Sequence, residues 1–569
     1  MKALSVSIWA DRLEYFLAGL LDWAADRPLR GALLVTLTAL IVIVPGLAEM
    51  PVTDRDEGRF VQASKQMLET GDLIDIRLQD QPRWKKPAGI YWLQAASASV
   101  AGGADAPIWA YRLPSAFAAL LVALLTMWGA RPLIGGRGAV LAGLMMISAL
   151  LMVVEGHIAK TDAALAATAA AVLGALSHLL IGQGGRGSAT VFWLGIAASI
   201  LLKGPIVPVI AACAIAWVWI VRRARPDLSR FYLMPGIALV VVLVAPWLIA
   251  IGVVSEGAFF AESLGRDMGA KLTSGQEKHW GPPGLYLGIV WGTFWPWAAL
   301  IPLAAGWLWA QRRQAWTVLL AGWVIPFWIV LEAVPTKLPH YVLPLYPALV
   351  IALAAWILGA ARVPPRWCAW VSAVLVMLPA LALGVGVIVL PPMLDGTGAW
   401  AGLPLAVLGL AAACVAAKAA LQDRVLAQVA ASFVAAMALY PAVLWGGFPT
   451  LQTAFASPRM AVAIAQYQAC ASGPAFSLGY HEPSLVFETY TEIRLGNPDG
   501  AMAALRENPG ALVLIEDRWR EILGDKVPDG LVTRARIEYF NYNRGKFQAA
   551  DLVTQDDARW QACEDEARG

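Results

Sequence analysis

An acidic pair directly after an apolar segment is the first feature of the sequence that could do chemistry. Asp56 and Glu57 lie in the run TDRDEGR (53–59). A carboxylate at the boundary between water and lipid can take a proton from a hydroxyl group, orient that group or hold a metal ion. The alternative is an acidic helix start, because residues 57–69 form an amphipathic pattern and acids favour helix N-termini. Spacing alone leaves both interpretations open.

Cationic residues recur at the ends of other apolar segments. Lys86 lies in RWKKP (83–87), Lys203 lies in LLKGP (201–205), and Lys337 and His340 lie in TKLPHY (336–341). Such side chains can bind a lipid phosphate at the membrane surface. Each is also compatible with an interfacial anchor, in which the charge extends from the apolar region to water.

A second carboxylate and a further histidine complete the set of candidates. Asp162 begins an apolar segment, where it could act in a site or cap a helix. His279 precedes a Trp and two prolines. A single histidine in such a place is more often structural than catalytic.

The composition requires a membrane protein. Of 569 residues, 59% are hydrophobic and 15% are charged, and the mean hydropathy is +0.61. A membrane-crossing helix needs roughly 20 apolar residues. This rule predicts an all-α polytopic fold with about thirteen spans, near 31–50, 112–131, 138–154, 162–182, 189–202, 204–221, 233–254, 284–309, 315–334, 341–361, 367–391, 402–419 and 425–446.

Basic residues gather in alternate short loops, and the positive-inside rule places those loops in the cytoplasm. The N-terminus is then cytoplasmic, and the region after the last span is periplasmic. The acids of the first 30 residues and the lack of a cleavage pattern argue against a cleaved signal peptide. The same topology puts six candidates on one membrane face: Asp56, Lys86, Asp162, Lys203, His279 and His340. Cations and carboxylates together suit transfer of a group activated by a lipid phosphate.

The chain divides into two predicted domains. Residues 1–446 form the transmembrane catalytic domain, in which 51–111 is a first periplasmic loop with interfacial helices. In 447–569, short β-like runs such as GALVLIED (510–517) alternate with helix-like stretches, which indicates a small α/β domain. A disulfide between Cys470 and Cys563 is a hypothesis for an oxidising compartment.

Taken together, the motifs resemble those of the GT-C membrane glycosyltransferases, in the branch of the lipid A aminoarabinose transferases and protein O-mannosyltransferases. The resemblance covers about 30–350, and 477–490 resembles the periplasmic domain of the aminoarabinose branch. The motifs that carry it are DEGR (56–59), KPAGIYWLQA (86–95), RLPSA (112–116), HIAKTDA (157–163), LKGP (202–205), TKLPHYVLPLYPAL (336–349) and, in the tail, SLGYHEPSLVFETY (477–490).

The resemblance implies a GT-C fold and an inverting transfer of a sugar from a polyprenyl phosphate, undecaprenyl phosphate in bacteria. The acceptor would be lipid A or another glycan of the cell envelope, at the periplasmic face of the inner membrane. By motif, the catalytic residues would be Asp56, Glu57 and Asp162, the residues that bind the donor phosphate Lys86, Lys203, Lys337 and His340, and the cavity residues Arg59, Tyr91 and His279.

One position departs from the family pattern. Relatives often carry an acid just before the Lys-Pro of the first loop, where this chain has Lys85. If that acid helps a histidine such as His279 to bind a divalent metal, metal binding is doubtful in this chain, and we expect no metal site.

Other functions remain open at this stage. One is a protein O-mannosyltransferase-like enzyme, and another is a transporter or flippase for lipid-linked sugars, which would favour charges near the membrane midplane and internal repeats. A third is a non-catalytic assembly or sensor protein. A net charge of +3 gives no indication of a nucleic-acid partner.

Overall fold

A computed structural model of the chain describes residues 2–53, 56–182, 184–223, 227–268, 280–359, 364–541 and 545–562. Helices dominate up to residue 450. In chain order these elements are α1 (Lys2–Asp26), α2 (Pro28–Ile43), α3 (Asp56–Thr70), α4 (Gly89–Val100), η1 (Gly103–Asp105), α5 (Ile108–Ile147), α6 (Leu150–His157), α7 (Asp162–Leu180), α8 (Arg186–Lys203), α9 (Ile206–Arg222), η2 (Leu228–Phe231), α10 (Leu233–Val254), α11 (Ala258–Phe260), η3 (Ala261–Met268), α13 (Leu285–Thr293), η4 (Trp297–Leu300), α14 (Ile301–Ala310), α15 (Ala315–Ala333), η5 (Pro339–Leu345), α16 (Tyr346–Gly359), α17 (Arg366–Asp395), α18 (Leu403–Leu421), α19 (Val425–Leu444) and η6 (Phe448–Thr450).

The predicted polytopic helical architecture is confirmed, but the count of thirteen spans is not. Within the described residues, eight helices are long and apolar enough to cross a membrane, or nine if the bent pair Leu285–Thr293 and Trp297–Ala310 is one span. Three of the remaining predicted spans fall on helices that do not reach this standard. These are the shorter apolar helices α2 and α9, and α8, which ends at Lys203.

Helix α5 accounts for two of the predicted spans, because it reverses direction at Gly135. This residue has φ 75° and ψ 180°, which lie outside the helical region and suit a residue without a Cβ atom. A Cβ atom on Gly143 would lie 3.1 Å from the Cβ atom of Met127. In one straight helix these two residues would be about 24 Å apart. The predictions at 112–131 and 138–154 therefore describe the two arms of a helical hairpin.

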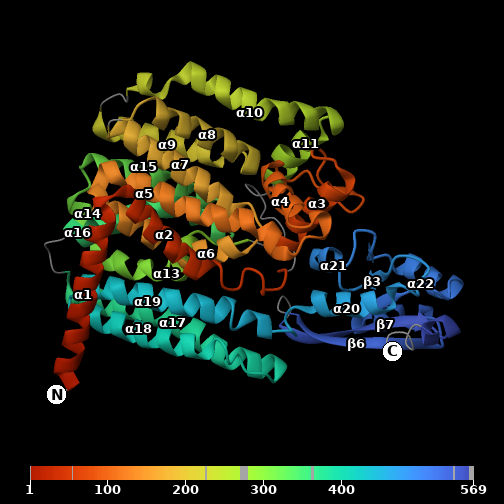
Figure 1. Ribbon diagram of the computed structural model, residues 1–569. Helices are drawn as coiled ribbons and strands as arrows, with labels where there is room; N and C mark the ends of the chain where they lie inside the picture. Colours follow the sequence, from red (N-terminus) through yellow and green to blue (C-terminus); the bar gives the residue numbers. More distant parts are fainter. Residues whose placement is uncertain are drawn as a thin grey trace.

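The first long loop folds into a small layer at one end of the helical body. It contains α3, the two-stranded antiparallel pair β1 (Arg77–Leu78) and β2 (Gln81–Pro82), and α4. Figure 1 shows α3 and α4 beside the C-terminal domain, with α11 nearby. Although α3 is rich in polar residues, most of it is buried: Gln62 and Ser64 are inaccessible, and Lys65 is 6% exposed.

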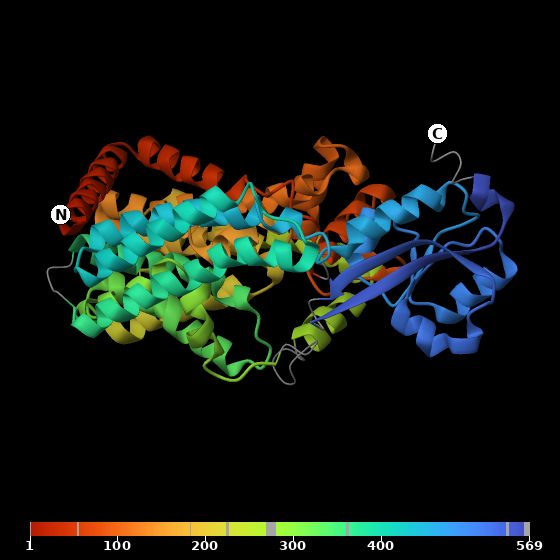
Figure 2. The same ribbon diagram turned by 90° about the horizontal axis from the view of Figure 1, so that it is seen from below.

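The C-terminal region forms a mixed five-stranded sheet, as the α/β prediction requires. Strand order is β4-β3-β5-β7-β6; β4, β3 and β5 are parallel, whereas β5–β7 and β7–β6 are antiparallel. In Figure 2 the long β6–β7 ribbon extends toward the helical body. The elements are α20 (Ala456–Gln468), β3 (Phe476–Leu478), α21 (Pro483–Glu488), β4 (Arg494–Leu495), α22 (Pro498–Glu507), β5 (Val513–Glu516), α23 (Asp517–Leu523), η7 (Gly524–Lys526), β6 (Leu531–Asn541) and β7 (Lys546–Gln555).

Cys470 is disulfide-bonded, while Cys213, Cys368 and Cys414 are free. Cys563, the partner hypothesised from the sequence, lies outside the described residues.

Candidate active site

Glu57 and Arg112 form a wholly buried ion pair under the first turn of α3. Arg112 Nε donates to Glu57 Oε1 at 2.8 Å, and Arg112 Nη2 donates to Glu57 Oε2 at 3.0 Å. Burial alone would raise the pKa of Glu57, but the Arg112 charge and the hydrogen bonds hold it below its usual value. Three more N–H···O bonds run from Arg112 to the backbone carbonyls of Leu47, Met50 and Pro51.

The carboxylate of Glu57 is saturated by further donors. Oε2 accepts from the backbone N–H and the hydroxyl group of Thr53, and Oε1 accepts from the N–H of Ala159. The pair thus ties together the segment after α2, the start of α3, α5 and the segment before α7. Glu57 does not face a substrate space in this arrangement, so the geometry does not fit the catalytic role predicted for it and fits a structural one.

Asp56, the neighbouring acid, is 51% exposed, and its Oδ1 lies 3.6 Å from Arg59 Nη1. Its charge acts on the phenol of Tyr91 and on the Lys160 ammonium group, so the carboxylate lies near both. Tyr91 is buried, stacks on Phe60, and accepts a hydrogen bond from Arg83 Nε at 3.1 Å. Of the two predicted acids, Asp56 is therefore the one that solvent can reach. Arg59 and Tyr91 lie near it.

A buried cluster gathers five ionisable side chains from separate parts of the chain. Lys160 Nζ lies 3.4 Å from Glu155 Oε1 and 3.9 Å from Asp162 Oδ2. Lys203, at the end of α8, donates to Asp162 Oδ1 at the start of α7. His340 lies between the carboxylates, with Nδ1 3.7 Å from Glu155 Oε1 and Nε2 3.6 Å from Asp162 Oδ2.

Charges around this cluster act on one another. The charge of Lys86, on the first loop, reaches His340. Burial raises the pKa of Glu155 to about 7, although Lys160 opposes the rise. Burial also disfavours the charged form of Lys160, but the carboxylates of Glu155 and Asp162 outweigh it and raise the Lys160 pKa. With Glu155 protonated, the two lysines face one carboxylate, so the cluster carries an excess positive charge that suits an anionic ligand.

The structure thus brings three of the predicted residues, Asp162, Lys203 and His340, into contact, and the charge of Lys86 acts on His340. Lys337 does not join them. Its ammonium group donates to the carbonyls of Leu331, Glu332 and Val334 at the C-terminal end of α15, and it lies over the ring of Tyr286. Because its three N–H groups cap a helix end, the geometry does not fit the predicted binding of a phosphate. His279 lies outside the described residues.

A cleft of about 520 Å³ opens beside Arg59, between the first loop and the segment at 258–262. Its charged lining consists of Arg59, Arg83, Lys85 and Glu262. Three cations around one acid are a poor donor set for a divalent metal. Within the described ranges, no group of three or more His, Cys, Asp or Glu side chains could hold a metal ion. The lining of this cleft is thus a poor match for a divalent metal, and His279, the histidine considered for metal binding, lies outside the described residues.

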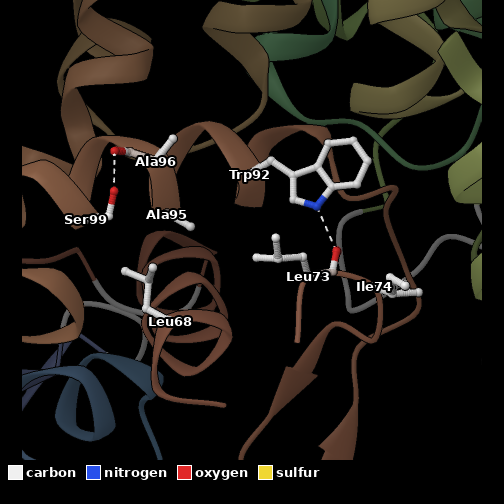
Figure 3. A pocket seen from close by; sticks show the side chains of 7 residues that line it. All are labelled: Leu68, Leu73, Ile74, Trp92, Ala95, Ala96 and Ser99. Atoms are coloured by element: carbon white, nitrogen blue, oxygen red, sulfur yellow. Dashed lines mark hydrogen bonds between the residues drawn. The ribbon is translucent and has the colours of Figure 1, made fainter. Parts of the chain in front are cut away.

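A second cleft, of about 400 Å³, lies on the other side of the loop layer and is apolar. Figure 3 shows Leu68 of α3, Leu73 and Ile74 of the loop, and Trp92 and Ala95 of α4 around it. The indole N–H of Trp92 donates to the carbonyl of Leu73 at 2.7 Å, which fixes the rim. The Trp92 ring also packs edge-on against Trp247 of α10, so the loop layer is attached to a membrane-spanning helix.

Sequence reasoning gave no site role to Arg112, Lys160 or Arg83. Arg112 lay within the quoted RLPSA motif and Lys160 within HIAKTDA, but single charges in these runs do not reveal their partners. A signal was present for Arg112, because a charged residue inside an apolar segment requires a partner. No comparable signal marks Arg83.

Comparisons with known proteins identify relatives of similar sequence and fold. A model of the dolichyl-phosphate-mannose-protein mannosyltransferase family matches residues 85–249. The undecaprenyl phosphate-α-4-amino-4-deoxy-L-arabinose arabinosyl transferase of Pectobacterium carotovorum is 27% identical over 379 residues, which are 63% of this chain and 67% of that protein. The transferase of the same name from Aeromonas salmonicida is 30% identical over 329 residues, covering 56% of this chain and 58% of its own length.

Among solved structures, ArnT from Cupriavidus metallidurans bound to undecaprenyl phosphate has a TM-score of 0.74 at 20% identity, covering 91% of this chain and 97% of that chain. Its apo form has a TM-score of 0.73, also at 20% identity, covering 92% of this chain and 97% of that chain. The predicted resemblance is therefore confirmed: the chain is a multi-pass membrane homologue of the GT-C glycosyltransferases of the aminoarabinose transferase type, and it has their fold.

Proposed function

We propose that the chain transfers a sugar from a polyprenyl phosphate, undecaprenyl phosphate in bacteria, to an acceptor of the cell envelope at the periplasmic face of the inner membrane. The observation that carries this proposal is the convergence of Glu155, Lys160, Asp162, Lys203 and His340 in one buried cluster near Asp56. Two relatives, which match 63% and 56% of this chain, bear the name of a transferase of an undecaprenyl phosphate sugar.

The charges of the cluster suit the departing phosphate. As the bond between the anomeric carbon and the phosphate oxygen breaks, its electron pair remains on the polyprenyl phosphate. Lys160, Lys203 and Lys86 stabilise that negative charge, which is the largest change of charge in such a reaction. Asp162 holds Lys203 and Lys160 in place through direct ion pairs.

Asp56 acts on the other substrate. The acceptor oxygen attacks the anomeric carbon from the side opposite the phosphate, and its proton passes to the Asp56 carboxylate, which yields inversion. Arg59 orients that carboxylate, and Glu57 fixes the helix turn on which it stands. A membrane-held donor and a membrane-near acceptor share one plane, which raises their effective concentration.

Lipid A is the preferred acceptor, followed by another envelope glycan and then by protein hydroxyl groups. The resemblance of the motifs to those of the lipid A aminoarabinose transferases favours the first. The mannosyltransferase family match over 85–249 favours the last and keeps a protein O-mannosyltransferase-like activity as the second candidate. A flippase for lipid-linked sugars has less support, because Asp162 and Lys203 lie at helix ends and meet there.

Replacement of Asp56 tests the proposal. In vesicles that contain the purified protein and an undecaprenyl phosphate sugar, we expect Asp56→Asn to lower kcat by about 10²- to 10⁴-fold, the range for loss of a general base. Asp80→Asn is the matched control, because Asp80 is an exposed acid of the same loop. Normal turnover of Asp56→Asn would refute the assigned role. Mass spectra of lipid A and of glycoproteins from a deletion strain and its parent then identify the acceptor.

A further inference from the structure

Helix α3 is held on the side away from Arg112 by the C-terminal domain. Gln62 Nε2 donates to Thr491 Oγ1 at 2.7 Å, and the same hydroxyl group donates to Glu69 Oε2 at 2.7 Å. Lys65 Nζ donates to the carbonyl of Phe487 at 3.3 Å and lies over the Phe487 ring. These contacts run along α3 from its second turn to its last.

The contact extends to the residues next to Asp56. A Cβ atom on Gly58 would lie 2.6 Å from the backbone nitrogen of Ser484, so only glycine allows α21 to approach the first turn of α3 this closely. Ser484 is itself fixed, since its hydroxyl group hydrogen-bonds that of Ser457 on α20 at 2.7 Å. The backbone that meets Gly58 therefore belongs to the packed interior of the C-terminal domain.

The loop after α3 is attached to the same segment. Gln79 Nε2 donates to the carbonyl of Thr491 at 2.9 Å, and Gln66 Oε1 accepts from the N–H of Gln79 at 2.8 Å. Residues 484–491 thus connect α3 with the chain that leads to Arg83 and Lys86. These polar contacts add to hydrophobic packing, because Val61 of α3 lies in a buried cluster against which Phe487 packs.

We infer that the C-terminal segment 484–491 positions Asp56 for the transfer reaction through Gly58 and Thr491, so that the C-terminal domain is part of the catalytic machinery. This inference rests on the proposed function. Arg112 holds the start of α3 through Glu57, and the segment holds the helix through Gly58 and Gln62, so two separate sets of contacts fix it. Thr491 and Gly58 are positioning residues, because neither carries the chemistry.

The test uses the full-length protein in vesicles and four variants. Thr491→Val keeps the shape and removes both hydroxyl hydrogen bonds, whereas Thr491→Ser restores a hydroxyl group. Gly58→Ala forces α21 away from α3. Gly473→Ala is the matched control, because a Cβ atom on Gly473, an exposed glycine of the same domain, meets nothing within 4 Å.

We expect Thr491→Val and Gly58→Ala to lower kcat by about tenfold or more, since small displacements of a reacting group have effects of this size. The KM for the donor should stay unchanged, because Lys160 and Lys203 lie on other elements and the Thr491 carbonyl that holds the chain leading to Lys86 stays in place. Thr491→Ser and Gly473→Ala should behave like the wild type. A wild-type kcat in Thr491→Val, or a raised donor KM with unchanged kcat, would overturn the inference.

Hydrogen exchange separates this inference from the proposed function. The amides of α3 should exchange faster in Thr491→Val than in the wild type and in Thr491→Ser, whether or not the wild type turns over an undecaprenyl phosphate sugar. If the wild type shows no turnover, the proposed function fails, and faster exchange still supports the contact that holds α3. Unchanged exchange in Thr491→Val would contradict that contact directly.

Discussion

Two buried groups of charges lie within the same end of the molecule and differ in how their charges are satisfied. In the Glu57–Arg112 pair, backbone carbonyls take the remaining guanidinium N–H groups and backbone N–H groups complete the carboxylate. In the cluster around Asp162, charged side chains meet mainly one another, and Glu155 Oε2 has no hydrogen-bond partner. We call the Glu57–Arg112 pair closed, because its hydrogen bonds are satisfied within the protein and it stabilises the fold. The cluster around Asp162 is open, because it can still interact with a ligand. Burial of a charge alone does not distinguish the two.

The largest effect is expected where the closed pair is broken. Arg112→Ala leaves the Glu57 carboxylate buried without its partner, and loss of one member of such a pair costs about 3–5 kcal/mol. Thermal unfolding in detergent should show this as a large fall in Tm or as loss of folded protein. Arg77→Ala removes an exposed arginine of the neighbouring loop and should change stability by less than about 0.5 kcal/mol. If the Arg112→Ala protein were stable and had a raised KM for the donor, the Glu57–Arg112 pair would instead belong to the active site.

Replacement of Lys203 should affect the donor rather than the fold. Lys203→Ala removes a charge-assisted interaction, for which about 1.5–3 kcal/mol is typical, so the donor KM should rise by about tenfold or more. Turnover at several donor concentrations measures the change. Lys418→Ala, in α18 and outside the cluster, provides the control. An unchanged KM and kcat would remove Lys203 from the phosphate site.

Lys337 provides a further test of this difference. It is a buried lysine whose N–H groups are satisfied by backbone carbonyls, as in the Glu57–Arg112 pair. Lys337→Ala uncovers three carbonyls at the end of α15 and should cost about 1–2 kcal/mol of stability. We expect the donor KM to stay at the wild-type value once equal amounts of folded protein are compared. A specific rise in KM would show that the lysine leaves its helix end to meet the phosphate.

The smallest effect concerns pH and the open cluster. Burial raises the pKa of Glu155 to about 7, so this carboxyl group becomes negative as the pH rises through neutrality. The added charge repels a phosphate, and the donor KM should rise severalfold between pH 6 and pH 8, within about one unit on either side of that pKa. Glu155→Gln should remove this dependence and keep the low-pH value. A pH profile of Glu155→Gln that matches the wild type would exclude Glu155 as its source.

The stability of the folded protein should also change as Glu155 loses its proton. Because the pKa of Glu155 is higher in the folded protein than its usual value of 4.5, its contribution to stability is fully present below about pH 4.5 and is lost as the pH rises through 7. The free energy of unfolding of the wild type and of Glu155→Gln, measured at pH 5 and pH 8, shows whether stability falls as the pH rises. The difference between the two proteins should be larger at pH 8.

The sequence alone predicted those parts of the fold that depend on long patterns of residues. Apolar runs and basic loops predicted the helical body, and the alternation of strands and helices predicted the C-terminal sheet. The interruption between Arg131 and Arg137 separated two spans, where Gly135 reverses the chain. The total of thirteen exceeded the helices that qualify, since α2 and α9 are short, α8 carries a charge at each end, and α5 holds two of the predicted spans.

The site was predictable only to the level of which membrane face its residues share. Asp162, Lys203 and His340 converge because the helix ends that carry them meet. Asp56 and Glu57, however, differ by one position on a helix, and only the location of Arg112 decides which of them is buried. The role of Lys337 depends on backbone carbonyls, which a list of side chains does not reveal.

The hydrogen bond between Gln62 and Thr491 joins residues that are 429 positions apart. During synthesis, Thr491 is added long after Asp56, so α3 cannot make this contact until the end of the chain has been made. A truncated or stalled polypeptide would lack the contact that holds α3. If the segment positions Asp56 as we infer, the order of synthesis keeps the enzyme inactive until its last domain has folded.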